Sequence, residues 1–106
     1  MKIAISSEGP GLDEQVDPRF GRAAGFVIVD PDTLTFDYLD NGAAQAQARG
    51  AGIAAAERVA GSGARVLLTG MVGPKALQVL RATGIRVEQE MNGLTVRQAL
   101  ERFKKA

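Results

Sequence analysis

The segment from Arg65 to Glu90, RVLLTGMVGPKALQVLRATGIRVEQE, decides the fold of this chain. Its opening run, Arg65 to Thr69, is apolar and short, which predicts a strand buried on both faces. A glycine-containing loop follows, and Pro74 then favours the first turn of a helix that extends to Thr83. Ile85 to Glu90 is the next predicted strand. A strand, helix and strand of these lengths indicate a right-handed crossover between parallel strands of an α/β protein.

Three further strands are predicted upstream, at Lys2 to Ser6, Gly25 to Asp30 and Leu34 to Asp40. The second is rich in β-branched residues and the third alternates in polarity, so the two predict a hairpin whose last strand is a half-exposed edge. Together with the crossover, these strands predict a two-layer or three-layer α/β fold with a mixed sheet.

Two more helices complete the pattern. Residues 43–52 are rich in Ala and Gln and are interpreted as a loop or a frayed helix, and a helix is predicted from Ile53 to Ala60. Its core-facing side is expected to hold Ile53, Ala56, Val59 and Ala60. Thr95 and Gln98 predict a capping box for the final helix. A core-facing stripe is expected there, made of Val96, Ala99, Leu100 and Phe103.

Composition narrows the function classes. The chain has 106 residues, 45% of them hydrophobic, and a net charge of +1, which predicts a single domain over residues 1–106 with no bulk attraction to nucleic acid or membranes. It contains no cysteine and no histidine, which excludes disulfides, thiolate or imidazole metal ligands and the commonest general base. The apolar runs are too short to span a membrane, and the first residues lack the longer apolar core of a signal peptide. We therefore expect a cytoplasmic protein.

The loop between the first two strands carries the most distinctive residues. Within VDPRFGRAAG, residues 16–25, Arg19 and Arg22 flank Phe20 and Gly21. Guanidinium groups are always charged and match oxyanions and other diffuse anions, while Phe20 is suited to anchor the loop on the core. This pattern favours an anion site. The alternative is a solvated loop whose arginines pair with the nearby acids.

Two glycine-rich segments are further candidates. Gly70 to Lys75 joins a buried strand to a helix, so glycines there let a ligand approach the backbone and the helix start offers free N–H groups to an anion. Met71 in this loop is a thioether of the kind that suits Cu(I). Gly50 and Gly52 also open a helix, although their weak GxGxxA match lacks the strand and acid of a dinucleotide site. Ordinary turns and packing are the alternatives.

Acidic residues are numerous but do not predict catalysis. They cluster in the first loop and around the hairpin, whereas a hydrolase or nuclease needs carboxylates that converge on a metal. The first strand, KIAIS, carries no acid. An enzyme acting on a small phosphorylated or nucleotide substrate is therefore the weakest of three interpretations, after a binder of an anion and a protein-interaction or regulatory module.

Four segments together resemble the nitrogenase iron–molybdenum cofactor biosynthesis family, over nearly the whole chain. VDPRFGRA is similar to the family's V-x-x-H-F-G-[RH]-A, and RGAGI contains its GAGI helix start. GMVGPKA matches its G-x-x-G-P-x-A loop, and NGLTVRQALERF resembles its C-terminal motif. The combination is specific, whereas each piece alone is not.

The resemblance implies a ribonuclease H-like motif, with a five-stranded mixed sheet flanked by helices. It also implies a non-enzymatic carrier of iron–molybdenum cofactor or its precursors. The family usually has histidine where this chain has Arg19. With neither thiol nor imidazole, the chain looks like the orange-protein branch of the family, which holds a molybdenum–copper sulfide cluster without covalent attachment.

The resemblance thus predicts a cluster held by charge, with assembly or delivery proteins as partners and a monomer or weak dimer as the oligomeric state. The expected cluster-binding residues are Arg19, Phe20, Gly21, Arg22, Gly50, Gly52, Gly70, Met71, Gly73 and Lys75. No residue is expected to bond the metal directly.

Overall fold

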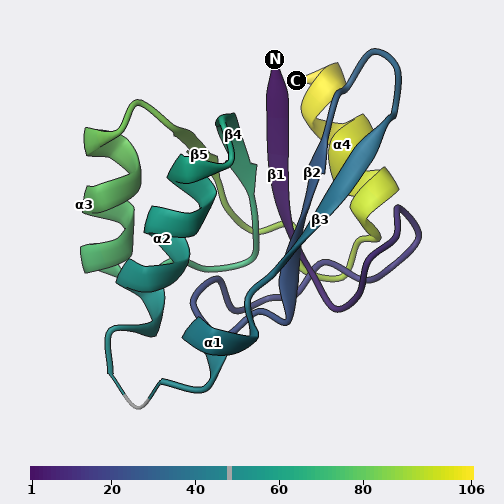
Figure 1. Ribbon diagram of the computed structural model, residues 1–106. Helices are drawn as coiled ribbons and strands as arrows, with labels where there is room; N and C mark the ends of the chain where they lie inside the picture. Colours follow the sequence, from purple (N-terminus) through teal and green to yellow (C-terminus); the bar gives the residue numbers. More distant parts are fainter. Residues whose placement is uncertain (48) are drawn as a thin grey trace.

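The computed structural model describes residues 1–47 and 49–106, which fold as a central sheet with helices on both faces (Figure 1). The strands are β1 (Lys2–Ser7), β2 (Gly25–Val29), β3 (Phe36–Asp40), β4 (Ala64–Leu68) and β5 (Arg86–Glu88). The helices are α1 (Gly42–Gln45), α2 (Ala51–Gly61), α3 (Pro74–Ala82) and α4 (Val96–Lys105).

The sheet is mixed and its strand order is β3-β2-β1-β4-β5. β1, β2 and β3 pair in an antiparallel manner, whereas β1, β4 and β5 are parallel. The predicted five-stranded mixed sheet and its edge hairpin are therefore confirmed. That the motif is ribonuclease H-like stays a prediction.

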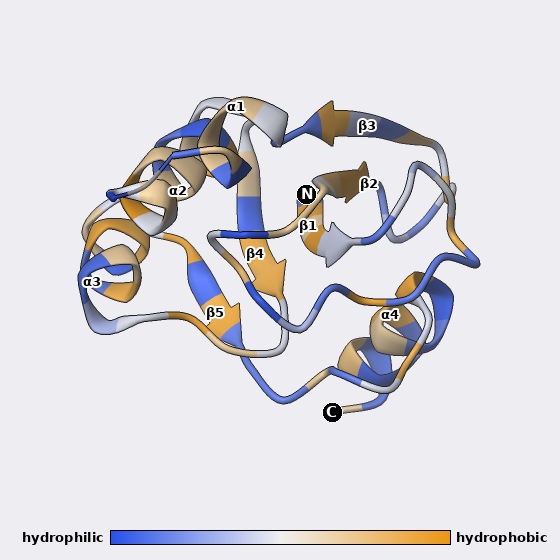
Figure 2. Cartoon of the chain, turned by 90° about the horizontal axis from the view of Figure 1, so that it is seen from below, coloured by the Kyte–Doolittle hydropathy of each residue, from blue (hydrophilic) through white to orange (hydrophobic). Residues whose placement is uncertain are grey.

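The side chains of the central strands point alternately to the two faces of the sheet, and this divides the core into two halves. Ile3 and Ile5 of β1 face one cluster, and Ala4 between them faces the other, because successive side chains point to opposite sides of a strand. α2 and α3 cover the Ala4 face, while α4 covers the face of the two isoleucines (Figures 1 and 2). The molecule therefore has three layers.

The final helix forms as predicted. The Thr95 hydroxyl accepts a hydrogen bond from the Gln98 backbone N–H at 3.1 Å, and the Gln98 side chain accepts one from the Thr95 N–H at 2.9 Å. These two bonds satisfy donors that a helix start would otherwise leave unpaired.

Two predicted helix features were wrong. α2 begins at Ala51 rather than Ile53, because Gly50 precedes it in a left-handed conformation, with φ of 73°, and acts as its N-cap. Ile53 is 37% exposed, so it does not belong to the buried side of α2. The buried residues of this helix are Ala51, Ala55, Ala56 and Val59. Their small size brings α2 close to the sheet and to α3.

The remaining differences lie at element ends. The third strand begins at Phe36 rather than Leu34, because Leu34 adopts a left-handed φ of 63° in the hairpin turn. The fifth strand is restricted to three residues, and Glu90 beyond it has a φ of 66°. The short helix α1 occupies part of the segment interpreted as a loop or a frayed helix; Ala48 of that segment lies outside the described residues.

Candidate functional site

The arginine-containing loop is fixed to the end of β1 by hydrogen bonds around Asp17. The Asp17 N–H donates to the Ser6 carbonyl at 2.9 Å, and the Ser6 hydroxyl donates to the Asp17 carbonyl at 2.8 Å. The Asp17 carboxylate is buried and accepts a hydrogen bond from the Arg19 backbone N–H at 3.1 Å. Phe20 is buried against Phe26, with ring centroids 5.3 Å apart. The predicted anchoring role of Phe20 is thus what the packing shows.

The glycine loop after β4 pairs with this arginine loop. Met71 donates its N–H to the Pro18 carbonyl at 2.9 Å, and the Phe20 N–H donates to the Met71 carbonyl at 3.1 Å, so Arg19 and Met71 form a parallel bridge. A Cβ on Gly70 would lie 2.5 Å from the Pro18 carbonyl oxygen. Only glycine lets the two backbones come this close.

The start of α2 packs on the same loop. A Cβ on Gly21 would lie 2.8 Å from the Cα of Gly52, and a Cβ on Gly52 would lie 3.2 Å from the Cβ of Ala76 in α3. The arginine loop, the start of α2 and the start of α3 are therefore in close contact, although they are far apart in the sequence. These helix starts and glycine loops therefore meet at one end of the sheet.

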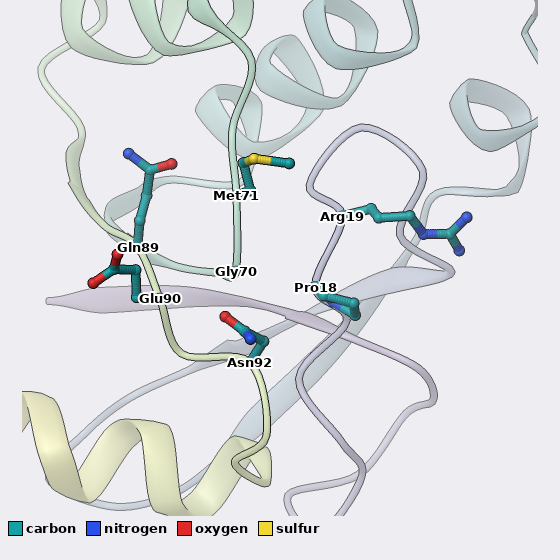
Figure 3. A pocket seen from close by; sticks show the side chains of 7 residues that line it. All are labelled: Pro18, Arg19, Gly70, Met71, Gln89, Glu90 and Asn92. Atoms are coloured by element: carbon teal, nitrogen blue, oxygen red, sulfur yellow. The ribbon is translucent and has the colours of Figure 1, made fainter.

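Two hollows lie beside these contacts. The first, called here the helix-start hollow, has a volume of about 310 Å³ and is lined by Phe20, Gly21, Gly50, Gly52, Ile53, Gly73, Pro74, Lys75 and Ala76. The second, called the Met71 hollow, has a volume of about 670 Å³ and is lined by Pro18, Arg19, Gly70, Met71, Gln89, Glu90 and Asn92 (Figure 3). Nine of the ten sequence-predicted site residues line one hollow or the other.

The helix-start hollow is the more favourable of the two for an anion. α2 and α3 both begin at it, neither N-cap makes a side-chain hydrogen bond, and neither first turn contains an acid. The positive ends of two helix dipoles and the ammonium group of Lys75 thus adjoin one space. In the Met71 hollow, by contrast, Glu90 lies across Gly70 and Met71 from Arg19 (Figure 3).

The two arginines have different surroundings. The Arg19 side chain is 64% exposed, and its Nε lies 3.7 Å from an Asp17 carboxylate oxygen, a long ion pair that leaves most of the guanidinium facing solvent. Arg22 donates from Nη1 to the Gln45 carbonyl at 2.9 Å and also to the Gln47 carbonyl. Arg22 lines neither hollow among the described residues, so its role in binding an anion stays a prediction.

Sequence reasoning missed two residues that hold the loops in place. Asn41 is fully buried, and its Nδ2 donates to the carbonyls of Gly21 and Ala23 at 3.3 and 3.0 Å. Gln89 accepts a hydrogen bond from the Val72 N–H at 2.9 Å and so fixes the glycine loop to the segment after β5. No local sequence pattern identified the role of either residue.

The donor set does not favour direct metal coordination. The chain contains neither His nor Cys, and within residues 1–47 and 49–106 no group of three or more carboxylates is placed to hold a metal ion. Met71 is 70% exposed, whereas Met91 is buried. The chemistry that remains at this end of the sheet is that of cations and free backbone N–H groups.

The comparisons with known proteins identify the family of this chain. The family model described as dinitrogenase iron-molybdenum cofactor matches residues 1–106. The chain belongs to this family. Three of the segments on which the resemblance rests, VDPRFGRA, GAGI and GMVGPKA, each contribute residues to the lining of the two hollows.

Solved structures support the membership. The apo form of the orange protein from Desulfovibrio gigas is 62% identical, with a TM-score of 0.96, and the match covers 98% of this chain and 87% of that one. A NifB-like protein of the DUF35 family from Thermotoga is 30% identical, with a TM-score of 0.84 and coverage of 99% and 88%. The search of curated proteins gave no significant match. A search of the described residues for a helix with the length and hydrophobicity of a membrane span found none.

Proposed function

We propose that this chain is a non-enzymatic binder or carrier of an anionic, molybdenum-containing metal–sulfur cluster, held without covalent ligands. The cluster is either a molybdenum–copper sulfide or a precursor of iron–molybdenum cofactor. The observation that carries the proposal is the helix-start hollow, where Lys75 and two helix N-termini without side-chain caps adjoin one space with no acid among its lining residues. The family description and the apo form of the orange protein support the class of ligand.

The chemistry of the hollow fits an anion whose metal ions are already coordinated by sulfide. Such a cluster needs no thiolate or imidazole from the protein, and this chain has none to give. It needs compensation of its negative charge, which each helix N-terminus supplies at about 0.3–1 kcal/mol and each charge-assisted hydrogen bond at about 1.5–3 kcal/mol. A volume of about 310 Å³ suits a small ligand.

The contributing groups have distinct roles in this proposal. The N–H groups at the starts of α2 and α3, near Gly52 and Lys75, donate to the cluster's sulfide atoms, and the Lys75 ammonium adds a full positive charge. Phe20 and Ile53 provide apolar contact and exclude water from one side of the hollow. Arg19 lies on the neighbouring loop and strengthens the positive field, which raises the rate of anion capture.

Reconstitution tests the proposal. The purified protein is incubated with tetrathiomolybdate and a copper salt, or with an iron–molybdenum–sulfur precursor, and then desalted. We expect retained colour and stoichiometric molybdenum with one of the two. A protein that leaves the column colourless and free of metal in both cases would overturn the proposal and favour the protein-interaction module.

A matched pair of variants locates the ligand. Lys75→Gln and Arg81→Gln remove the same charge from opposite ends of α3, since Arg81 lies in its last turn. We expect Lys75→Gln to weaken cluster retention at least tenfold and Arg81→Gln to weaken it no more than about twofold. Equal losses would mean that net charge, rather than the helix-start hollow, governs retention.

A further inference from the structure

The strand β3 forms one edge of the sheet and is a candidate docking surface that is independent of the cluster site. β2 pairs with one side of β3, and in the described residues no strand or isolated bridge pairs with the other side. Figure 2 shows β3 along the outer margin of the sheet, with β2 on its inner side. An open edge of this kind presents backbone donors and acceptors that an added strand can use.

The register identifies which peptide groups face outward. Asp30 donates to Thr35 at 2.9 Å, and Asn41 donates to Ala24 at 3.0 Å, so these are hydrogen-bonded pairs of the β2–β3 hairpin. Because such pairs alternate along an antiparallel ladder, the N–H and C=O groups of Phe36, Tyr38 and Asp40 point away from β2. Asp37 and Leu39 then occupy positions where side chains of an added strand come closest to those of β3.

The edge is both acidic and apolar. β3 carries Asp37 and Asp40, both exposed, and contains no basic residue. Phe36 is 40% exposed, and Leu34 just before it is 38% exposed. Charged residues on an edge strand protect it from pairing with other chains. Two large, exposed apolar side chains give no such protection and instead favour contact with a partner.

A small hollow adjoins this edge on the Ala4 face of the sheet, the face to which Ile28 also belongs. Its volume is about 200 Å³ and its lining residues are Lys2, Ile28, Asp30, Thr35, Phe36 and Asp37. The hollow offers an apolar floor at Ile28 and carboxylates at Asp30 and Asp37. This arrangement suits a long basic side chain, whose methylene groups cover the floor while its charged end meets the carboxylates. Lys2 is the one basic residue among those that line this hollow. It forms no ion pair within 4.0 Å with any of the described residues.

We propose that the β3 edge accepts an extended, basic segment of another protein as a sixth strand. Backbone bonds form with Phe36, Tyr38 and Asp40, and a lysine or arginine of the segment lies opposite Asp37 and enters the hollow at Ile28. Apolar residues of the segment lie opposite Phe36 and Tyr38, so the partner alternates basic and apolar residues. This is strand addition with specificity from alternate side chains.

Charge favours such a partner over a second copy of this chain. Two β3 strands paired about Tyr38 would place four carboxylates, two copies each of Asp37 and Asp40, along one seam without a basic residue in either strand. Cross-strand pairs of opposite charge stabilise a sheet, and like charges destabilise it.

A capped seven-residue peptide of alternating lysine and valine tests the proposal. Its binding is followed by fluorescence anisotropy and by amide chemical shifts of the full chain. We expect the shifts to concentrate in β3 and around Ile28, and we expect binding to be lost when every peptide nitrogen is methylated. A peptide with glutamate in place of lysine should bind at least tenfold more weakly.

Matched variants separate a specific contact from net charge. Asp37→Asn and Asp32→Asn change the charge equally, but Asp32 lies in the exposed turn before β3. We expect Asp37→Asn to weaken binding at least fivefold and Asp32→Asn less than twofold, and Asp37→Lys to reverse the preference toward the glutamate peptide. The proposal would be overturned by an absence of binding, by shifts outside β3, by equal effects of the two asparagine variants, or by a dimer of the free chain that Asp37→Asn strengthens.

Discussion

Placing a carboxylate at the start of α3 should stabilise the fold and weaken anion binding at the same time. Gly73 is the N-cap of α3, with φ of −68° and ψ of 160°, and a Cβ there would meet no atom within 4 Å. Aspartate is a preferred N-cap residue and adopts this backbone without strain. Gly73→Asp therefore introduces a cap and a negative charge into an open position that lines the helix-start hollow.

The two effects can be estimated separately. A better cap contributes a few tenths of a kcal/mol over glycine, the helix dipole about 0.3–1 kcal/mol, and the loss of glycine's freedom in the unfolded chain about 0.4–1 kcal/mol. The sum is about 1–2 kcal/mol, and each kcal/mol raises the Tm of a domain of this size by about 4–8 °C. A unit charge about 4 Å from an anion costs about 1 kcal/mol in water and about 4 kcal/mol at the dielectric typical of a protein surface. Anion affinity should fall at least about fivefold.

Thermal unfolding and equilibrium dialysis against tetrathiomolybdate measure the two quantities. Gly73→Asn is the matched control, because asparagine caps the helix without adding charge, and it should keep most of the gain in Tm with a smaller loss of affinity. If Gly73→Asp raised the Tm and bound tetrathiomolybdate as tightly as the parent chain, the anion could not lie at the start of α3.

Three other predictions concern the loops and the pH dependence of stability. Arg22→Ala should lower the free energy of unfolding by about 1 kcal/mol in urea titrations, because it removes donors to two backbone carbonyls. Gly70→Ala should lower the Tm sharply, since its Cβ would contact a carbonyl oxygen at 2.5 Å, whereas Gly61→Ala in open helical surroundings should raise the free energy of unfolding by about 0.5–1 kcal/mol. The hydrogen bond and charge of Arg97 lower the pKa of Asp13 in the folded state, so the stability that the pair contributes is present above about pH 4 and is lost as the pH falls through the lowered value. Asp13→Asn should remove that part of the acid dependence in unfolding curves measured between about pH 2 and 6.

The elements of the fold follow from local patterns in the sequence. The apolar run from Arg65 to Thr69, the proline that opens α3 and the capping box at Thr95 each act over a few residues, and the structure contains each element where it was predicted. Hydrophobic alternation likewise defines the two faces of β1. Ile53 was misassigned because it lies at the exposed helix-start hollow rather than on the buried side of α2, which a helical period alone does not reveal.

The sequence by itself determined that no thiolate or imidazole of this chain can bind a metal, because the chain contains neither cysteine nor histidine. Only the tertiary structure decided which charges share a space. The starts of α2 and α3 lie together because Gly21, Gly52 and Ala76 pack against one another. In the folded chain Arg22 donates to backbone carbonyls, whereas Arg19 is largely exposed. The physical reason is that helix starts and strands form from local interactions, whereas the approach of distant backbones depends on packing among residues that the sequence does not place side by side.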